Sequence, residues 1–241
     1  SVQYSSTNML TISGFETLTG GDLEDVLTFA VFGSAVDISL VSVGTIDGFD
    51  ITETSLTTTF ENINRLVGSS ASTDALTGLD AVSNWTPSAV GATYTSTNSM
   101  SITAVETLNG GSDRDTLDYS GYPTPVSVIL TGASTDGFSG SGTDLPGFSN
   151  MDIILGGLGS DTLTGANVDA TWDLNPANYQ YTVNPTLDFV SFETLIGGNQ
   201  ADIFNIIGAR VESLQGGPGD DSFVFADGAT ISTAIQGGIG S

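Results

Sequence analysis

The sequence predicts an all-β fold, a parallel β-solenoid of the β-helix or β-roll type. Three observations lead to this prediction: long segments of the chain repeat, glycine turns recur at a regular spacing, and no stretch reads as a regular helix. Gly, Ser, Thr and Asn interrupt every candidate helix, and these residues are unfavourable in helix interiors. A β-sandwich would also give short strands, but not a glycine-pair turn that recurs at one period.

The repeats define how the chain is organised. The segment that begins at Tyr4 recurs at Tyr94, at an offset of 90 residues, with 12 of 26 positions identical and no gap. A third copy begins at Tyr181, at a further offset of 87 residues. We therefore predict one continuous solenoid over residues 1–241, with internal units 4–93 and 94–180 and a partial unit 181–241.

Glycine turns set the length of one coil. The intervals between them are 48, 42, 46, 41, 19 and 21 residues, for turns that begin at Gly20, Gly68, Gly110, Gly156, Gly197, Gly216 and Gly237. We take each short interval as one coil and each long interval as two, which predicts about 11 coils of 19–24 residues. Apolar residues beside the turns would then form inward columns, namely Leu18, Leu108, Leu195, Leu214 and Leu27, Leu117, Leu163, Phe223. Trp85 and Trp172 are expected in the core.

Composition and charge exclude several classes of function. The chain has 28 acidic and three basic residues, a net charge of −25, and no Lys, His or Cys. Three arginines cannot neutralise the phosphates of a nucleic acid, so no nucleic acid partner is expected. Without Cys and His there are no disulfides, Cys/His zinc sites or histidine-based catalysis, which leaves oxygen ligands and calcium. No apolar run approaches the ~20 residues that span a membrane.

Two turns carry a complete nine-residue motif of the form GGxGxDxUx, where U is a large apolar residue. One begins at Gly156 and the other at Gly216. The glycines permit positive φ and turn backbone carbonyls toward one point, and the aspartate adds a carboxylate. These turns resemble the RTX, or haemolysin-type, calcium-binding repeats of secreted bacterial proteins. The whole chain resembles still more the β-strand-repeat surface or filament proteins, which carry single RTX-like turns between other coils.

The resemblance implies that Ca²⁺ binds at the turns. The candidate metal-site residues are Gly216, Gly217, Gly219, Asp220, Asp221 and Asp202 in the C-terminal stack of turns, and Gly156, Gly157, Gly159 and Asp161 in an isolated motif. The turns at Gly20, Gly68, Gly110 and Gly197 lack the third glycine, and Arg114 lies in one of them, where it could replace a cation. The alternative is that the aspartates only cap backbone N–H groups of their turns.

A second acidic residue recurs four positions before the glycine pair. It is present at Glu16, Glu106, Asp152, Glu193 and Glu212. Like charges stacked one strand apart repel each other unless they are screened or bridged. We favour a solvated edge that resists lateral aggregation, and the alternative is that Glu193 and Glu212 contribute to a cation site.

These features predict a structural segment of an extracellular bacterial fibre, adhesin or cell-surface protein, and not an enzyme. Repeats fill the chain, and any acidic pair that could act as acid and base recurs at the coil period, as expected for architecture. Neither end has a polar cap, which predicts a longer repeat chain or end-to-end association of copies into a filament. The alternative function is a calcium-binding RTX-like module of a larger secreted toxin or enzyme.

Glycans are a further partner that the sequence leaves open. Serine and threonine runs at residues 57–59 and 69–70, which we expect to be exposed, suit O-glycosylation, although the strand propensity of Thr and the turn propensity of Ser explain them as well. Asn84, Trp85 and Thr86 form a single N-x-T sequon, a triplet that also arises by chance.

Overall fold

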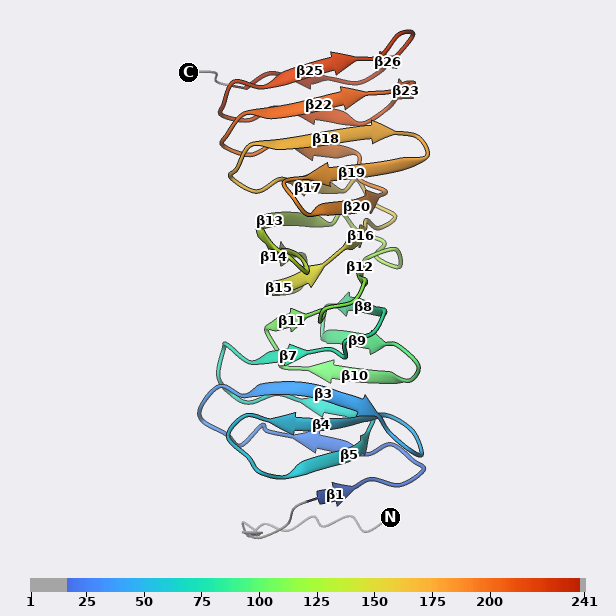
Figure 1. The fold of residues 1–241 in the computed structure, drawn as a ribbon. Helices are drawn as coiled ribbons and strands as arrows, with labels where there is room; N and C mark the ends of the chain where they lie inside the picture. Colours follow the sequence, from blue (N-terminus) through green and yellow to red (C-terminus); the bar gives the residue numbers. More distant parts are fainter. Residues whose placement is uncertain (1–16, 239–241) are drawn as a thin grey trace.

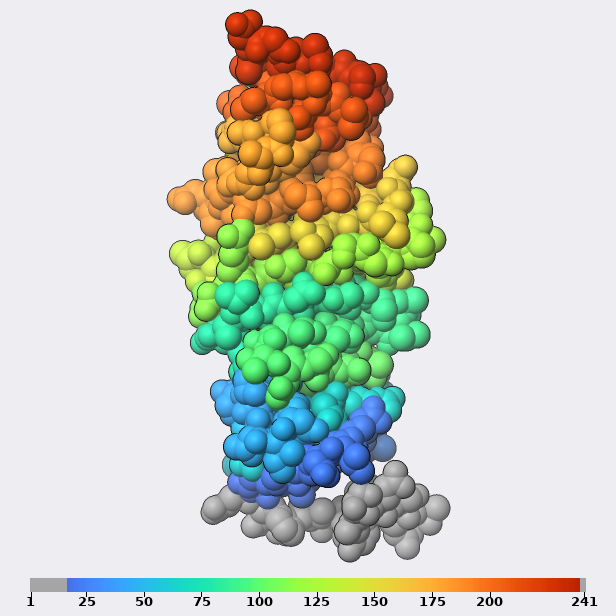
Figure 2. All heavy atoms as spheres, turned by 90° about the vertical axis from the view of Figure 1, so that its right-hand side faces the viewer, coloured from blue at the N-terminus to red at the C-terminus, as the bar shows by residue number. Residues whose placement is uncertain are grey.

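The computed structural model describes residues 17–238, and the regular elements in this range are all β-strands. Residues 1–16, which include Tyr4 and Glu16, and residues 239–241 lie outside the described part. Figure 1 shows the strands stacked along one long axis, from β1 at one end to β25 and β26 at the other. Figure 2 shows the chain advancing along this axis in successive bands. An all-β chain with parallel strands in long sheets is therefore confirmed.

Two long sheets and one short pair contain the described strands. In spatial order, the 13-stranded sheet A consists of β1 (Thr17–Thr19), β5 (Thr59–Ile63), β4 (Phe49–Glu53), β3 (Asp37–Val43), β7 (Ala75–Thr77), β11 (Thr107–Asn109), β15 (Leu145–Met151), β14 (Gly137–Gly142), β13 (Ser127–Ser134), β17 (Thr162–Thr164), β21 (Thr194–Ile196), β24 (Ser213–Gln215) and β27 (Ile235–Gln236). The 12-stranded sheet B consists of β2 (Val26–Thr28), β6 (Arg65–Val67), β10 (Ser99–Thr103), β9 (Gly91–Thr95), β8 (Ser83–Ser88), β12 (Asp115–Asp118), β16 (Ile153–Leu155), β20 (Thr186–Val190), β19 (Asn178–Thr182), β18 (Ala170–Asn175), β22 (Asp202–Ile206) and β25 (Ser222–Phe225). Strands β23 (Ala209–Arg210) and β26 (Thr230–Ile231) form the short pair.

The chain passes back and forth between sheets A and B, and each level of the stack is called a rung below. Most neighbouring strands within a sheet are parallel, as in β7 with β11 and β17 with β21. Each sheet also contains antiparallel meanders of three consecutive strands, β3–β4–β5 and β13–β14–β15 in sheet A and β8–β9–β10 and β18–β19–β20 in sheet B. Within a meander the chain runs back along the axis, so that β3 pairs with β7 while β5 pairs with β1.

The meanders correct the prediction of about 11 uniform parallel coils. Each long interval between glycine turns holds one meander, whereas the C-terminal intervals of 19 and 21 residues hold none. The physical cause is the tight connection between strands: only Thr135 and Asp136 join β13 to β14, and Gly137 follows with φ of 136°. A two-residue connection reverses the chain, because parallel neighbours need a much longer crossover.

The core lies between sheets A and B and contains the inward residue of each short strand. In β7, β11, β17, β21 and β24 this residue is a leucine that is at most 1% exposed. Leu195, for example, pairs in register with Leu163 on one side and Leu214 on the other. The two ends of this column, Leu18 and Ile235, are 51% and 37% exposed. The predicted column of Leu18, Leu108, Leu195 and Leu214 is therefore confirmed, and it is exposed at the two ends of the described part. The second predicted column was wrong for Leu163, which lies in sheet A beside Leu195, whereas Leu27, Leu117 and Phe223 lie in sheet B.

Aromatic rings extend the core through the C-terminal rungs. The ring of Trp172 lies nearly parallel to that of Phe204, with centroids 5.4 Å apart, and Phe204 stacks on Phe223 at 5.0 Å. These residues come from β18, β22 and β25, which are neighbours in sheet B. Trp85 and Trp172 are both fully buried, which confirms their predicted place in the core.

Candidate functional site: the aspartate turns

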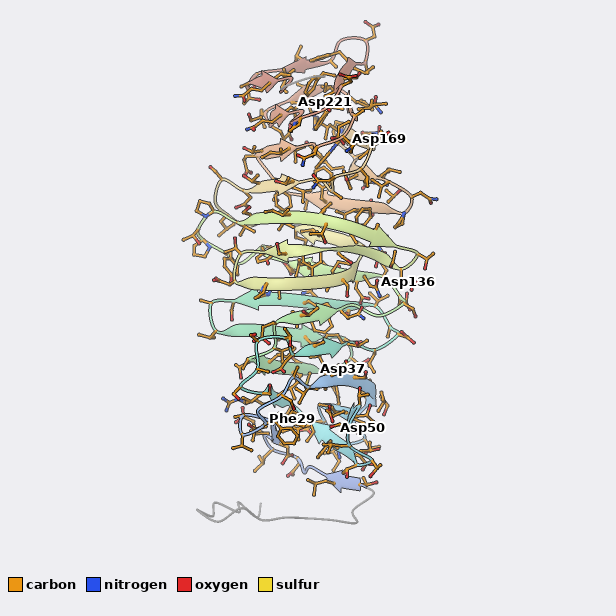
Figure 3. The ribbon with its side chains drawn as sticks, turned by 90° about the vertical axis from the view of Figure 1, so that its left-hand side faces the viewer. Phe29, Asp37, Asp50, Asp136, Asp169 and Asp221 are labelled. Carbon is orange, nitrogen blue, oxygen red and sulfur yellow. The ribbon has the colours of Figure 1, made fainter. Side chains whose placement is uncertain are left out.

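The glycine turns lie at the two edges where the chain crosses between the sheets. At one edge the chain passes from sheet A to sheet B, through turns that begin at Gly20, Gly110, Gly197 and Gly216. At the other it returns from sheet B to sheet A, through turns that begin at Gly68 and Gly156. The two complete motifs therefore lie at opposite edges. Figure 3 shows aspartates, among them Asp37, Asp136 and Asp221, following one another along the stack.

The aspartate of a turn folds back over that turn and accepts backbone hydrogen bonds. Asp161 Oδ2 accepts from the N–H of Gly157 at 2.5 Å, and Asp161 Oδ1 accepts from the N–H of Val126 at 2.7 Å. Asp74 is bound in the same way by the N–H of Ser69 at 2.5 Å. Both aspartates are fully buried. At these two turns the carboxylate closes the turn and ties it to the neighbouring loop.

The first glycine of a turn is required because the space beside its Cα is filled. A Cβ at Gly156 would lie 1.8 Å from the carbonyl oxygen of Ser191 on the next rung and 3.1 Å from Asp161 Oδ2. A Cβ at Gly197 would lie 2.4 Å from Asp202 Oδ2. The turn aspartate and the backbone of the next rung both lie against the Cα of this glycine, which explains why a glycine recurs at a fixed distance before the aspartate.

The second acidic position caps the turn aspartate of a neighbouring rung. Three of these carboxylates accept a hydrogen bond from the backbone N–H of such an aspartate. The pairs are Glu106 with Asp74 at 2.9 Å, Asp152 with Asp115 at 2.8 Å and Glu193 with Asp161 at 2.7 Å. Glu212 accepts instead from the hydroxyl of Tyr179 at 2.5 Å. Neither interpretation drawn from the sequence included this role, because each partner is 32 to 37 residues away.

Asp202 and Asp221, two of the predicted calcium ligands, are brought together on adjacent rungs. Asp221 Oδ1 accepts a hydrogen bond from the N–H of Asp202 at 3.0 Å. Asp202 is fully buried, and in the described part of the chain its carboxylate oxygens make no hydrogen bond of ordinary geometry; Asp221 Oδ2 also lacks one. The indole of Trp172 is near enough to Asp202 to favour its charged form, which partly opposes the effect of burial. Buried carboxylate oxygens with so few donors are unfavourable alone, and their chemistry suits a cation with oxygen ligands or a bound proton.

The remaining predicted metal-site residues are spread over separate places. Gly217 and Gly219 have positive φ of 94° and 137° in the turn that begins at Gly216. Gly219 and Asp220 line a hollow of about 410 Å³ together with Asp169. Gly159 packs closely against the neighbouring loop, since a Cβ there would lie 2.6 Å from a backbone nitrogen. Within residues 17–238, no group of three or more acidic side chains is close enough to hold a metal ion.

Burial changes the titration of two turn aspartates. Burial raises the pKa of Asp115 to about 7; the hydroxyl of Ser83, 2.5 Å from Oδ1, opposes this shift and nearby Asp152 adds to it. Burial also raises the pKa of Asp202 to about 7, with the charge of Asp221 as the second cause. The residue that pairs with Asp115 on the neighbouring strand is Ser83, whose hydroxyl donates to it. The residue that pairs with Asp202 in the same way is Ala170, so Asp202 has no such hydroxyl donor.

The variant Asp115→Asn is expected to be more stable than the wild type at about pH 8 and similar to it near pH 4. The pKa of Asp115 in the folded chain, about 7, lies above the ordinary aspartate value of 3.8, so between these pH values the folded chain binds one more proton than the unfolded chain. The charged carboxylate therefore destabilises the fold above pH 7, and this penalty disappears as the pH falls toward 3.8. Urea unfolding of both proteins across this pH range measures the difference.

Asp161→Asn is the matched control for this prediction. Asp161 already accepts two backbone hydrogen bonds, and an amide can replace only one of these acceptors. This control should lose stability at both ends of the pH range. An Asp115→Asn effect that is equal at both pH values would contradict the titration of Asp115.

Arg114 lies beside a polar groove on the outer surface. It forms an ion pair with Asp188 of β20, and its side chain is 55% exposed. The groove has a volume of about 370 Å³, and its lining includes the carboxylates of Asp113, Asp136 and Asp152. The arginine therefore balances part of an acidic surface.

The predicted glycan acceptors differ in accessibility. Ser69 is 5% exposed, and its hydroxyl donates to Asp74 at 2.8 Å, so its description as part of an exposed run was wrong. Thr57 is exposed in the connection between β4 and β5. Asn84 of the sequon is half-buried on the outer side of sheet B, where its amide donates to Asp118 at 3.1 Å.

Comparison with known proteins leaves the function to be proposed from geometry. No protein-family model, curated protein or solved structure matches this chain. Over the described residues, no helix has the length and apolar character that crossing a membrane would require.

Proposed function

We propose that this chain is a structural segment of an extracellular bacterial fibre, adhesin or surface protein. In this proposal sheets A and B are the walls of a β-solenoid, and copies associate end to end through the edge strands. The observation that carries the proposal is the column of inward apolar residues in sheet A. These residues are buried within the stack, and the column is exposed at Leu18 and Ile235. Apolar surface of this kind favours another strand over water.

The edge strands at the two ends have compatible directions. Strand β1 is parallel to β5, β27 is parallel to β24, and the pairings between them make β1 and β27 parallel to each other. Strand β27 of one copy can therefore pair with β1 of the next, and β25 with β2 in sheet B. Such contacts are head-to-tail, and a head-to-tail contact that does not close into a ring gives an open filament.

The double variant Leu18→Asp, Ile235→Asp is expected to abolish filaments. Each substitution places a carboxylate where the contact would bury it without a partner, which is strongly unfavourable. Negative-stain microscopy of the full chain, in EGTA and in millimolar calcium, provides the measurement. Wild-type chains should give long fibres of uniform diameter, and the double variant should give only short rods.

Val90→Asp is the control for this experiment. Val90 is 78% exposed in the turn between β8 and β9, far from both ends, so this variant should form fibres like the wild type. Short monodisperse wild-type rods in both buffers would overturn the end-to-end part of the proposal.

A calcium-binding RTX-like module of a larger secreted toxin or enzyme is the second candidate function. It is favoured by the unpartnered oxygens of Asp202 and Asp221, to which calcium would supply the missing interaction. A cation that binds only the folded chain stabilises it, and a net charge of −25 increases this effect. Circular dichroism of the full chain in EGTA and in millimolar calcium separates the candidates: a calcium-dependent module gains its strand signal only with calcium, and a structural segment is folded in EGTA.

A further inference from the structure

Nine neighbouring strands of sheet A, all within the described part, contain no charged residue. In spatial order they are β7, β11, β15, β14, β13, β17, β21, β24 and β27. Their outward residues are mostly small or hydroxyl-bearing: Thr162 pairs with Ser127 and Thr194, and Thr107 pairs with Ala75. The outer side of these nine strands is called the uncharged face below. These strands carry no charge on a chain with a net charge of −25, and the exposed Asp136 and Asp144 lie at the border of the face, in the hairpins that join β13, β14 and β15.

Acidic side chains are present instead on the outer side of sheet B. Asp118, Asp188 and Asp173 occupy outward positions on β12, β20 and β18. Side-chain amides of neighbouring strands hold all three: Asn84 donates to Asp118 at 3.1 Å, Gln180 to Asp188 at 3.0 Å and Asn205 to Asp173 at 2.7 Å. Over the nine strands of the uncharged face the two outer sides of the stack therefore differ in charge, whereas β3, β4 and β5 of sheet A carry the outward acidic residues Asp37, Asp50 and Glu61.

Electrostatics decides which surfaces of two such chains can come together. Chains of equal charge repel, and a contact that desolvates carboxylates without cationic partners is strongly unfavourable. The uncharged face avoids this penalty, and its small side chains allow two sheets to pack about 10 Å apart. Phe138 and Phe148 of these strands are buried in the core, so the described part of this face presents no ring on which a sugar could stack.

We propose that the uncharged face is a lateral contact between two copies of this chain, related by a two-fold axis. Nine strands spaced about 4.8 Å apart extend over roughly 40 Å, which with two outward residues per strand gives an area on the order of 500 Å² per copy. A standard interface buries about 800 Å² per partner, so a single lateral pair is weak. In an end-to-end filament many such pairs act together, although the lateral contact does not depend on that association.

Cysteine cross-linking tests this contact directly, because the chain contains no cysteine of its own. Ile129 lies on β13, the middle strand of the uncharged face, and is 47% exposed. A two-fold axis through the centre of the face places Ile129 of one copy near Ile129 of the other. Under mild oxidation Ile129→Cys should form disulfide dimers roughly tenfold faster than Ile203→Cys, because the contact raises the local thiol concentration. Ile203 is the matched control, an outward isoleucine on β22 of sheet B that is 43% exposed.

Sedimentation velocity provides the second measurement. It uses the double variant Leu18→Asp, Ile235→Asp, in which end-to-end association is blocked. This variant and its Ile203→Asp derivative should form lateral dimers, and more of them at high salt because salt screens the repulsion between copies. Its Ile129→Asp derivative should stay monomeric with an unchanged circular dichroism spectrum. Because this background forms no filament, failure of the filament and failure of the lateral contact can be distinguished.

Three results would overturn the proposal. One is equal cross-linking rates for Ile129→Cys and Ile203→Cys. Another is a Leu18→Asp, Ile235→Asp variant that remains monomeric at high salt and high protein concentration. The third is a wild type that binds an insoluble polysaccharide through this face without dimerising, with binding lost in Ile129→Asp, which would assign the face to a glycan.

Discussion

Replacing Gly156 with alanine is expected to lower the free energy of unfolding by about 4 kcal/mol, at the upper end of single substitutions. The new Cβ would lie 1.8 Å from the carbonyl oxygen of Ser191 and 2.8 Å from its carbonyl carbon. Both are backbone atoms of the next rung, so relief requires the two rungs to separate. Separation would weaken the hydrogen bond from the N–H of Gly156 to the carbonyl of Val190 at 2.9 Å, which continues the strand ladder. Urea unfolding followed by far-ultraviolet circular dichroism measures the change.

Gly121→Ala is the matched control. A Cβ at Gly121 would meet no atom within 4 Å, so this variant should differ from the wild type by about 0.5 kcal/mol or less. If both glycine variants lose the same stability, a general effect of glycine on the unfolded chain explains the result better than the packing of rungs.

The recurrence of Gly156 and Asp161 in one motif predicted a turn correctly, because the motif is local. Within six residues it contains the glycine, the carboxylate that fills the space beside it and the N–H of Gly157 that the carboxylate binds. The apolar positions beside the turns were predictable for a similar reason. A strand as short as β17 has one inward residue, Leu163, and that residue must be apolar.

The meanders and the contacts between rungs were not predictable in the same way. The signal for a hairpin was present at Asp136 and Gly137, but the repeat period was read as the coil length, and the long intervals were divided into parallel coils. The hydrogen bond between Glu193 and the N–H of Asp161 depends on which strands become neighbours, which the meanders decide. Asp115 and Asp202 differ in their surroundings because the strand partner of Asp115 is Ser83 and that of Asp202 is Ala170. This difference can be recognised only when the pairing of the strands is known.

Replacing Trp172 with alanine is expected to lower the free energy of unfolding by about 3–5 kcal/mol, the usual loss for a large buried aromatic side chain. The substitution removes a fully buried ring that stacks on Phe204 and contacts Tyr181 edge-on with centroids 4.6 Å apart. It would also leave the stack of Phe204 and Phe223 open on one side. Urea unfolding should therefore begin in the C-terminal rungs, because stability in a stacked repeat is largely a sum over neighbouring rungs.

The variant also contains its own local probe. Only two tryptophans are present, so Trp172→Ala leaves the fluorescence of Trp85 to report on sheet B around β8. We expect this fluorescence to change at higher urea concentration than the far-ultraviolet circular dichroism, which reports on the whole chain. Phe225→Ala is the control, because Phe225 is 44% exposed on β25 and its removal leaves no cavity in the core. Coincident transitions in Trp172→Ala would mean that the two halves of the stack unfold as one cooperative unit, and a loss as small as that of Phe225→Ala would mean that the aromatic stack contributes little to stability.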